Sequence, residues 1–182
     1  MSKKKKAEPD LSKLLKLDLA CGQNKQARYH GVDFVAMDGV DTVHDLTVMP
    51  WPFEAGSVGA VHCSHFIEHL DGQQQIAFME ELYRVMVPGA QAVIIAPYYT
   101  SMRAWQDPTH RRSISEACFL YYNKQWRHDQ KLDHYPITCD FDFSYAYILT
   151  PDWAQKHHEA VQCAIRHYWN VVNDLHVTLT RR

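Results

Sequence analysis

The sequence lacks the segments that hold a protein in a membrane or export it. No apolar run in its 182 residues is long enough to span a bilayer. The N-terminal stretch Met1–Lys6 is basic and has none of the apolar character that a secretory signal requires. We therefore expect a cytoplasmic protein without a membrane partner.

Paired cysteines are missing as well. The five cysteines are widely separated and include no Cys-x-x-Cys pair, which disfavours both a disulfide framework and a structural zinc finger. We expect reduced and mostly buried thiols instead. The cysteines are Cys21, Cys63, Cys118, Cys139 and Cys163.

The sequence has no excess of charge of either sign. A formal net charge of −2 gives no general attraction to nucleic acid or to anionic lipid, so we expect no nucleic-acid partner. Hydrophobic residues make up 46% and charged residues 22%, which is ordinary for a globular protein. We expect a flexible basic leader over residues 1–12 and one domain over residues 13–182, in an oligomeric state that the sequence leaves open.

Predicted strands alternate with helices toward the C-terminus, which is typical of an α/β fold. The helices are predicted at 73–86, at 113–122 behind a capping box, and at 150–168. The first crossovers are too short for full helices, so we expect a Rossmann-like sheet with reduced early helices. Strands are predicted at residues 14–20, 31–35, 42–46, 58–64, 92–96, 138–149 and 171–180.

The turn after the first predicted strand is the strongest local sign of a ligand site. Parallel sheets bind ligands at the carboxyl ends of their strands, and small residues such as Ala20 and Gly22 let the backbone approach a ligand. A dinucleotide site would need a third glycine where Lys25 stands, so NAD is disfavoured. A tight turn without a ligand explains this segment equally well.

Acidic residues follow the next two predicted strands. Asp33 lies where such folds place an acceptor for ribose hydroxyls, and Asp45 lies where a carboxylate can accept from an adenine amino group. Each one alone is explained as well by capping of a turn. Three acids at successive strand ends, with Asp18 as the first, are harder to explain by capping.

Five segments form a set in chain order, namely Leu17–Gly22, His44–Leu46, Pro50–Phe53, Ser64–Leu70 and Glu81–Gly89. Together they resemble the class I S-adenosylmethionine-dependent methyltransferases, in particular the group called type 11. The resemblance implies one Rossmann-like domain with a mostly parallel seven-stranded sheet and a reversed last strand. It also implies S-adenosylmethionine as the cofactor.

The resemblance also assigns the cofactor-binding residues, by position. Asp18, Ala20 and Gly22 are expected at the methionine end, although Ala20 replaces the usual glycine. Asp33 is expected at the ribose, Asp45 and Leu46 at the adenine, and Ser64 beside the sulfonium.

Two histidines are candidates for a base that removes a proton from the acceptor. His65 follows the fourth predicted strand, and His110 lies in a loop after the fifth, where Asp107 can orient it. Arg111 and Arg112 are candidates for holding an anionic acceptor group. The alternative is a structural loop in which Asp107 caps a turn and the arginines are solvated.

A metal site is disfavoured by the sequence. His65 and His69 have helical spacing and Cys63 is near them, but no carboxylate support is evident, and Glu68 and His69 are interpreted as capping and packing residues. The aromatic stretch from Phe119 to Trp126 suits either a substrate pocket or the core.

We therefore expect transfer of a methyl group to an oxygen or nitrogen of a small-molecule or sugar-like acceptor. The alternative is a catalytically silent binding or partner domain with the same fold, supported by Ala20 and by the short first crossover. A third hypothesis is a metal-dependent hydrolase that uses the histidines.

Overall fold

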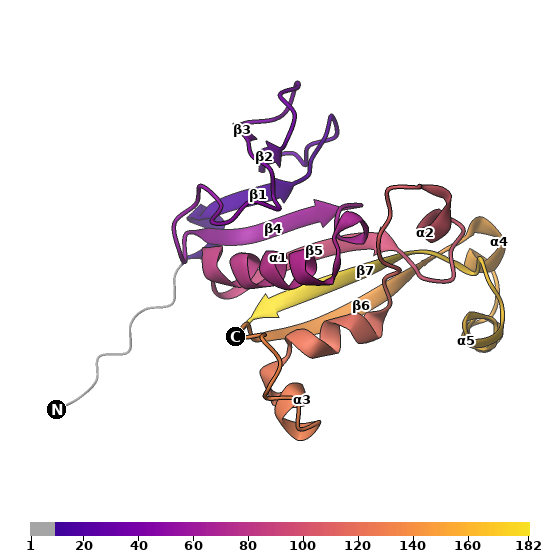
Figure 1. Ribbon diagram of the computed structural model, residues 1–182. Helices are drawn as coiled ribbons and strands as arrows, with labels where there is room; N and C mark the ends of the chain where they lie inside the picture. The colour runs from indigo at the N-terminus through magenta and orange to yellow at the C-terminus, as the bar shows by residue number, and fades with distance from the viewer. Residues whose placement is uncertain (1–9) are drawn as a thin grey trace.

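One mixed sheet organises the chain in the computed structural model, which describes residues 10–182 (Figure 1). Its strand order is β3-β2-β1-β4-β5-β7-β6, and β7 is antiparallel to both of its neighbours while β1 to β5 pair in parallel. The α/β prediction with a reversed last strand is thereby confirmed. The strands are β1 (Leu15–Leu19), β2 (His30–Asp33), β3 (Thr42–Val43), β4 (Val58–Ser64), β5 (Met86–Pro97), β6 (Phe141–Leu149) and β7 (Val172–Arg181).

Within the described part of the chain, helices enter the fold only after β4, apart from a short 3-10 helix near residue 11. No helix connects β1 to β2, β2 to β3 or β3 to β4, which confirms the predicted reduction of the early helices. The α-helices are α1 (Gly72–Val85), α2 (Arg103–Gln106), α3 (Lys124–Asp129), α4 (Pro151–Ala154) and α5 (His158–His167). The 3-10 helices are η1 (Leu11–Lys13), η2 (Ile67–His69) and η3 (Glu116–Tyr122).

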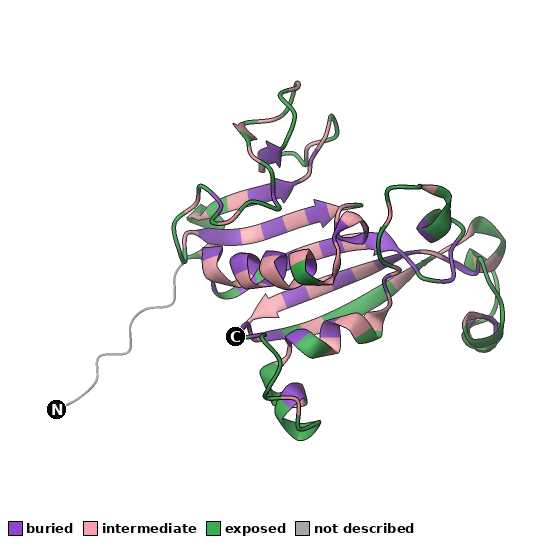
Figure 2. Cartoon of the chain, viewed as in Figure 1, coloured by how far each residue is buried: buried purple, intermediate pink, exposed green. Residues whose placement is uncertain are grey.

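The α1 helix packs on one face of the sheet, against β5 (Figure 1). Its first turn is fixed by a capping box in which the Asp71 side chain accepts from the backbone of Gln73 and Gln74. Phe78 and Leu82 of its apolar stripe are fully buried. Figure 2 shows the sheet striped with buried and partly buried residues, as expected when only one face is fully covered.

Two predicted helices differ from the structure. The capping box at Ser113 is wrong, because Ile114 is buried and pairs with Tyr98 as an isolated parallel bridge, which keeps the backbone extended there. The predicted helix over residues 150–168 breaks into α4 and α5 at an exposed polar stretch. Val161 and Ala164 are buried and anchor α5, whereas α4 has no buried residue. Because α4 is not anchored by burial, the two segments do not form one continuous helix.

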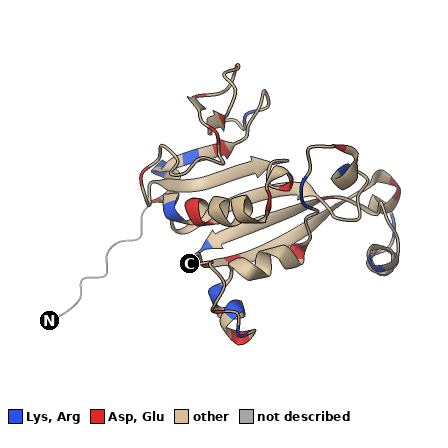
Figure 3. Cartoon of the chain, viewed as in Figure 1, with Lys and Arg blue, Asp and Glu red and all other residues tan. Residues whose placement is uncertain are grey.

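The start of the chain is described only from residue 10, so residues 1–9 of the predicted leader lie outside the described part. Leu11, in η1, packs against the core together with Leu14. Basic and acidic residues are interspersed over the described elements (Figure 3). Within residues 10–182 no helix combines the length and the apolar character needed to cross a membrane.

Candidate functional site

The turn after β1 is tied to the end of β2. Gly22 has a φ of 51° and Ala20 has a φ of 53°, so both adopt the left-handed conformation that favours glycine. The Gly22 N–H donates to Asp33 Oδ2 over 2.9 Å. Asp33 therefore lies against the turn, as the sequence predicts, and its two oxygens keep lone pairs for further donors beyond Gly22 and Val35.

Asp18 supports this turn from beneath. Its side chain is buried, and its carboxylate accepts from the Gln26 N–H and contacts His62 Nδ1, each over 2.6 Å. Asp18 thus ties the end of β1 to the loop that follows the turn and to His62 of β4, and its contact with a cofactor stays a prediction.

A hollow of about 410 Å³, called here the strand-end cavity, opens at the carboxyl ends of β1, β2 and β4. Of the seven predicted cofactor residues, Asp18, Gly22 and Ser64 do not line it and the other four do. Its lining residues are Ala20, Asp33, Phe34, His44, Asp45, Leu46, His65, Phe66, His69 and Thr109.

The far wall of this cavity follows β3. Asp45 Oδ1 accepts from the backbone and the hydroxyl of Thr47 over 2.9 and 2.7 Å, and these bonds lower the pKa of Asp45. Its carboxylate is therefore ionised at neutral pH. Leu46 is buried and supplies an apolar wall, while Phe34 lines the cavity with 73% of its surface exposed. Sequence reasoning missed Phe34, although a large aromatic residue directly after Asp33 was a usable signal.

A second hollow of about 280 Å³, called here the histidine cavity, adjoins the first. It brings together all three predicted catalytic residues, His65, His110 and Asp107, from segments that follow β4 and β5. The two cavities share His65 and His69. The lining residues of the histidine cavity are His65, Glu68, His69, Pro97, Arg103, Gln106, Asp107 and His110.

His65 stands between the cavities in an unusual conformation. Its φ of 55° lies in the left-handed region, which is uncommon for a residue with a side chain and is concentrated at functional sites. Its Nδ1 lies 2.9 Å from Ser64 Oγ, and its Nε2 lies 3.4 Å from Asp174 Oδ1. The contact with the Asp174 carboxylate raises the pKa of His65.

His110 is held by the backbone and not by Asp107. Its Nδ1 donates to the Ala104 carbonyl over 3.1 Å, whereas its Nε2 is 4.0 Å from Asp107 Oδ2. Asp107 instead accepts from the backbone and hydroxyl of Thr109 over 2.8 and 2.7 Å, so it shapes the turn. Asp107 is thus at ion-pair distance from His110 without a hydrogen bond to it, and its role in orienting His110 stays a prediction.

The predicted arginines point elsewhere. Arg111 lies 3.6 Å from an Asp71 carboxylate oxygen, and Arg112 donates to Gln75 over 2.8 Å. The arginine that lines the histidine cavity is Arg103, which pairs with Asp174 over 2.8 Å. Sequence reasoning missed Arg103 because its neighbours along the chain give no sign that it meets β7.

The interpretation of Glu68 and His69 as caps is also wrong. Both lie in η2, while the helix that follows is capped by Asp71. Glu68 is only 1% exposed and His69 faces both cavities.

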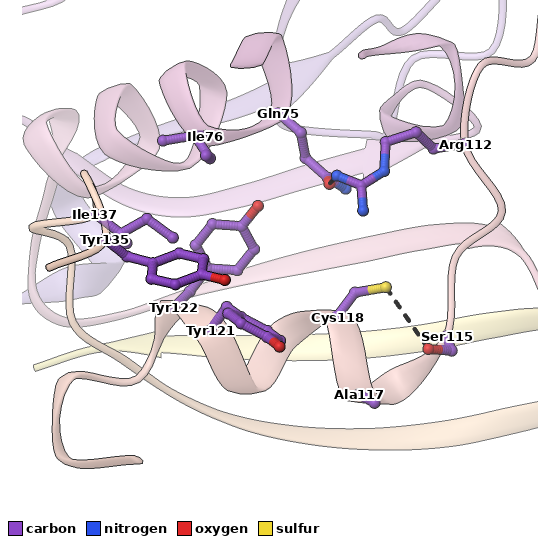
Figure 4. A pocket seen from close by; sticks show the side chains of 10 residues that line it. All are labelled: Gln75, Ile76, Arg112, Ser115, Ala117, Cys118, Tyr121, Tyr122, Tyr135 and Ile137. Atoms are coloured by element: carbon purple, nitrogen blue, oxygen red, sulfur yellow. Dashed lines mark hydrogen bonds between the residues drawn. The ribbon is translucent and has the colours of Figure 1, made fainter. Parts of the chain in front are cut away.

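The aromatic stretch after β5 divides between two roles. Tyr121 and Tyr122 line a separate hollow of about 410 Å³ between α1 and η3, beside Arg112 (Figure 4), whereas Phe119 is buried in the core. This hollow shares no lining residue with the strand-end cavity or the histidine cavity. It is therefore a separate cavity from the two at the strand ends.

Comparison with known proteins relates this chain to methyltransferases. Residues 5–94, close to half of the chain, match a family described as methyltransferase domain. This match and the fold are consistent with the class I S-adenosylmethionine-dependent methyltransferase family. No curated protein sequence matches it significantly.

Solved structures of methyltransferases share the fold at low sequence identity. A SAM-dependent methyltransferase from Archaeoglobus fulgidus is 17% identical with a TM-score of 0.64, over 94% of this chain and 88% of that one. The small RNA methyltransferase HEN1 is 12% identical with a TM-score of 0.54, over 93% and 23%. Geranyl diphosphate C-methyltransferase from Streptomyces coelicolor, solved with S-adenosyl-L-homocysteine, is 15% identical with a TM-score of 0.55, over 93% and 72%.

S-adenosylmethionine is the cofactor of this family, and the strand-end cavity fits it. The cavity offers a carboxylate for ribose hydroxyls at Asp33, a second carboxylate at Asp45, and apolar surface at Leu46 and Phe34 for an adenine ring. Ala20 puts a methyl group at the wall where the family has glycine, and the backbone adopts the glycine-type conformation all the same.

Proposed function

We propose that the protein transfers the methyl group of S-adenosylmethionine to an oxygen or nitrogen of a small, polar acceptor, such as a sugar-like molecule. The observation that carries this proposal is the pair of adjoining cavities that share His65 and His69. A cofactor in the strand-end cavity and an acceptor in the histidine cavity can meet there. Holding two reactants in line supplies about 7–11 kcal/mol in well-oriented systems.

Different residues of this chain then bind different parts of the cofactor. When bound, the cofactor supplies a methyl group on an activated, positively charged sulfur. Asp33 accepts from the ribose hydroxyls, Asp45 and Leu46 hold the adenine, and the turn at Ala20 and Gly22, which Asp18 supports, positions the methionine end. Ser64 fixes His65 from the strand end.

Proton removal from the acceptor is assigned to His65. Its ring lines both cavities and therefore reaches the point where the acceptor atom must stand. His110 and Asp107 line the same histidine cavity and contact the acceptor there. The narrow size of this cavity, about 280 Å³, favours a small acceptor or a single end group over an extended surface.

The fold alone does not choose the acceptor, because a neighbour named for small RNA and one named for geranyl diphosphate have the same fold. A near-neutral net charge of −2 favours a small molecule over nucleic acid. The catalytically silent alternative draws on Ala20, whose side chain stands where the family keeps glycine.

Calorimetry with S-adenosylmethionine and S-adenosylhomocysteine tests the proposal first. We expect saturable binding that Asp45→Ala and Gly22→Trp weaken, and the absence of heat with wild-type protein would favour a silent domain. Transfer of labelled methyl groups to fractionated small metabolites and to total RNA then tests the acceptor. Label appearing only in RNA would contradict the small-acceptor part of the proposal.

A further inference from the structure

The histidine cavity contains a cluster of possible metal ligands, and metal binding is not part of the proposed methyl transfer. Glu68, His69 and His110 each offer one ligand atom, and these three atoms all lie within 4.8 Å of one another. The two imidazole rings meet edge to face, with centroids 4.7 Å apart. Glu68 and His69 come from η2 after β4, whereas His110 comes from the loop after β5.

The carboxylate of Glu68 is buried without a hydrogen-bond partner among the described residues. The residue is 1% exposed, and within residues 10–182 neither Oε1 nor Oε2 has a hydrogen-bond partner. Buried polar atoms in proteins are almost always paired, and an unpaired buried carboxylate is especially unfavourable. Burial raises the pKa of Glu68, but a neutral carboxylic acid would still leave its hydroxyl without an acceptor. A bound cation satisfies both oxygens.

Both histidines are prepared as ligands by their outer contacts. His110 Nδ1 faces the Ala104 carbonyl, which can only accept, so Nδ1 carries the hydrogen and Nε2 of the neutral ring keeps its lone pair. The Thr109 hydroxyl donates to Asp107 and therefore accepts from His69 Nδ1–H over 3.0 Å, which frees His69 Nε2 in the same way. Imidazoles that donate their second N–H to an oxygen are the usual metal-ligating arrangement.

We propose that Glu68, His69 and His110 bind one divalent metal ion of the first transition row. Two imidazoles and one carboxylate suit zinc, manganese, cobalt or iron(II). Ligand atoms in a tetrahedral zinc site are about 3.4 Å apart, given bonds of about 2.1 Å, so binding draws these side chains together by at most about 1.4 Å.

Three protein ligands leave at least one coordination position for water or substrate, as in catalytic metal sites. Glu68, His69 and His110 all line the histidine cavity, so that position opens into it. The metal therefore takes an oxygen ligand from the acceptor, a hydroxyl group in particular, and this second part rests on the proposed methyl transfer. The sequence disfavoured a metal because only His65 and His69 had suitable spacing, but His65 faces Asp174 and the third ligand is His110.

The test is metal binding to metal-free full-length protein, without cofactor or acceptor. Mn²⁺ binding is followed by loss of the free-ion signal in electron paramagnetic resonance, and Zn²⁺ binding by competition with a chromophoric chelator. We expect one ion per chain and a loss of affinity of at least about tenfold in Glu68→Gln and His110→Gln. Thr109→Val, which touches no metal, should weaken binding about 10- to 100-fold by releasing His69 Nδ1.

His128→Gln is the matched control, because His128 is an exposed histidine 3.2 Å from the Asp133 carboxylate. It should leave the affinity unchanged. Stoichiometric binding that survives all three cluster variants, or that only His128→Gln removes, would overturn the site, as would the absence of binding by the wild type. Thermal unfolding verifies that each variant is folded, and Thr109→Val decides the question if the ligand variants are not.

Binding of S-adenosylhomocysteine is titrated on the same samples. Absence of metal binding by the wild type, with S-adenosylhomocysteine binding intact, overturns the metal site and leaves the proposed function standing. Metal binding without any S-adenosylhomocysteine binding supports the site and refutes the proposed function.

Discussion

Glu81 of α1 connects the helix to the segment that follows the adenine side of the strand-end cavity. Its Oε1 accepts from the Trp51 N–H over 2.6 Å and from Arg84 Nη2 over 2.6 Å, while Oε2 accepts from Arg84 Nε over 2.8 Å. Trp51 is 2% exposed and donates from Nε1 to the carbonyl of Leu46. We predict that Glu81→Gln destabilises the protein although its shape hardly changes.

The magnitude follows from the two kinds of contact. The bond to the buried Trp51 N–H is charge-assisted, and hydrogen bonds to charged groups contribute about 1.5–3 kcal/mol. The ion pair adds little, because the Arg84 side chain is 33% exposed and such pairs are worth about 0–1 kcal/mol. We expect a loss of about 2 kcal/mol, which corresponds to a fall in Tm of about 4–8 °C for a chain of this size.

The pH dependence of this loss has a definite sign. Burial alone would raise the pKa of Glu81, but the hydrogen bonds from Arg84 and Trp51 outweigh it and lower the pKa below its ordinary value of 4.5. A carboxyl group with a lowered folded pKa stabilises the protein above its unfolded pKa, and this contribution is lost as the pH falls through the folded pKa. The difference between wild type and Glu81→Gln should therefore be full at pH 7 and shrink below pH ~4.5.

Urea unfolding followed by circular dichroism at pH 7 and at pH ~4 measures both expectations. Glu54→Gln is the matched control, since Glu54 is exposed in the loop that follows Trp51, and it should change stability by less than ~0.5 kcal/mol. A stability loss in Glu81→Gln that is equal at the two pH values, or no loss at pH 7, would refute the reasoning.

Three further predictions concern the site and its scaffold. Asp33→Asn should weaken S-adenosylhomocysteine binding by about 10-fold or more in calorimetry, because it removes a charged acceptor, whereas Asp38→Asn in the exposed loop after β2 should not. Gly59→Ala should lower the unfolding free energy by about 1–3 kcal/mol, since a Cβ there would lie 2.7 Å from the Leu11 carbonyl oxygen; equal urea midpoints would contradict this. His65→Gln should lower kcat by about 100-fold or more while S-adenosylhomocysteine binding is retained, and an unchanged kcat would exclude His65 as the base.

The elements that local sequence predicts best are those in which burial and capping agree. The helix predicted at 73–86 is found at Gly72–Val85, because the capping box at Asp71 and the apolar stripe with Phe78 specify the same segment. The strand predicted at 58–64 is found at Val58–Ser64. Where burial depended on distant partners the prediction was wrong, as at Ile114, which pairs with Tyr98 across the chain.

The sequence by itself determined those site residues that lie at a strand end or directly after it. The turn at Ala20 and Gly22, Asp33 at the end of β2, and Asp45 after β3 are local features, and parallel strands necessarily bring their carboxyl ends to one edge of the sheet.

Only the tertiary structure decided which side chains from different elements come into contact at that edge. Glu68 and His110 lie 42 positions apart in the sequence, and their partnership depends on β4 and β5 being neighbours in the sheet. Asp174 reaches His65 only because β7 inserts antiparallel between β5 and β6. The physical reason is that spacing along a chain fixes contacts within one element, whereas contacts between elements follow from strand order and packing.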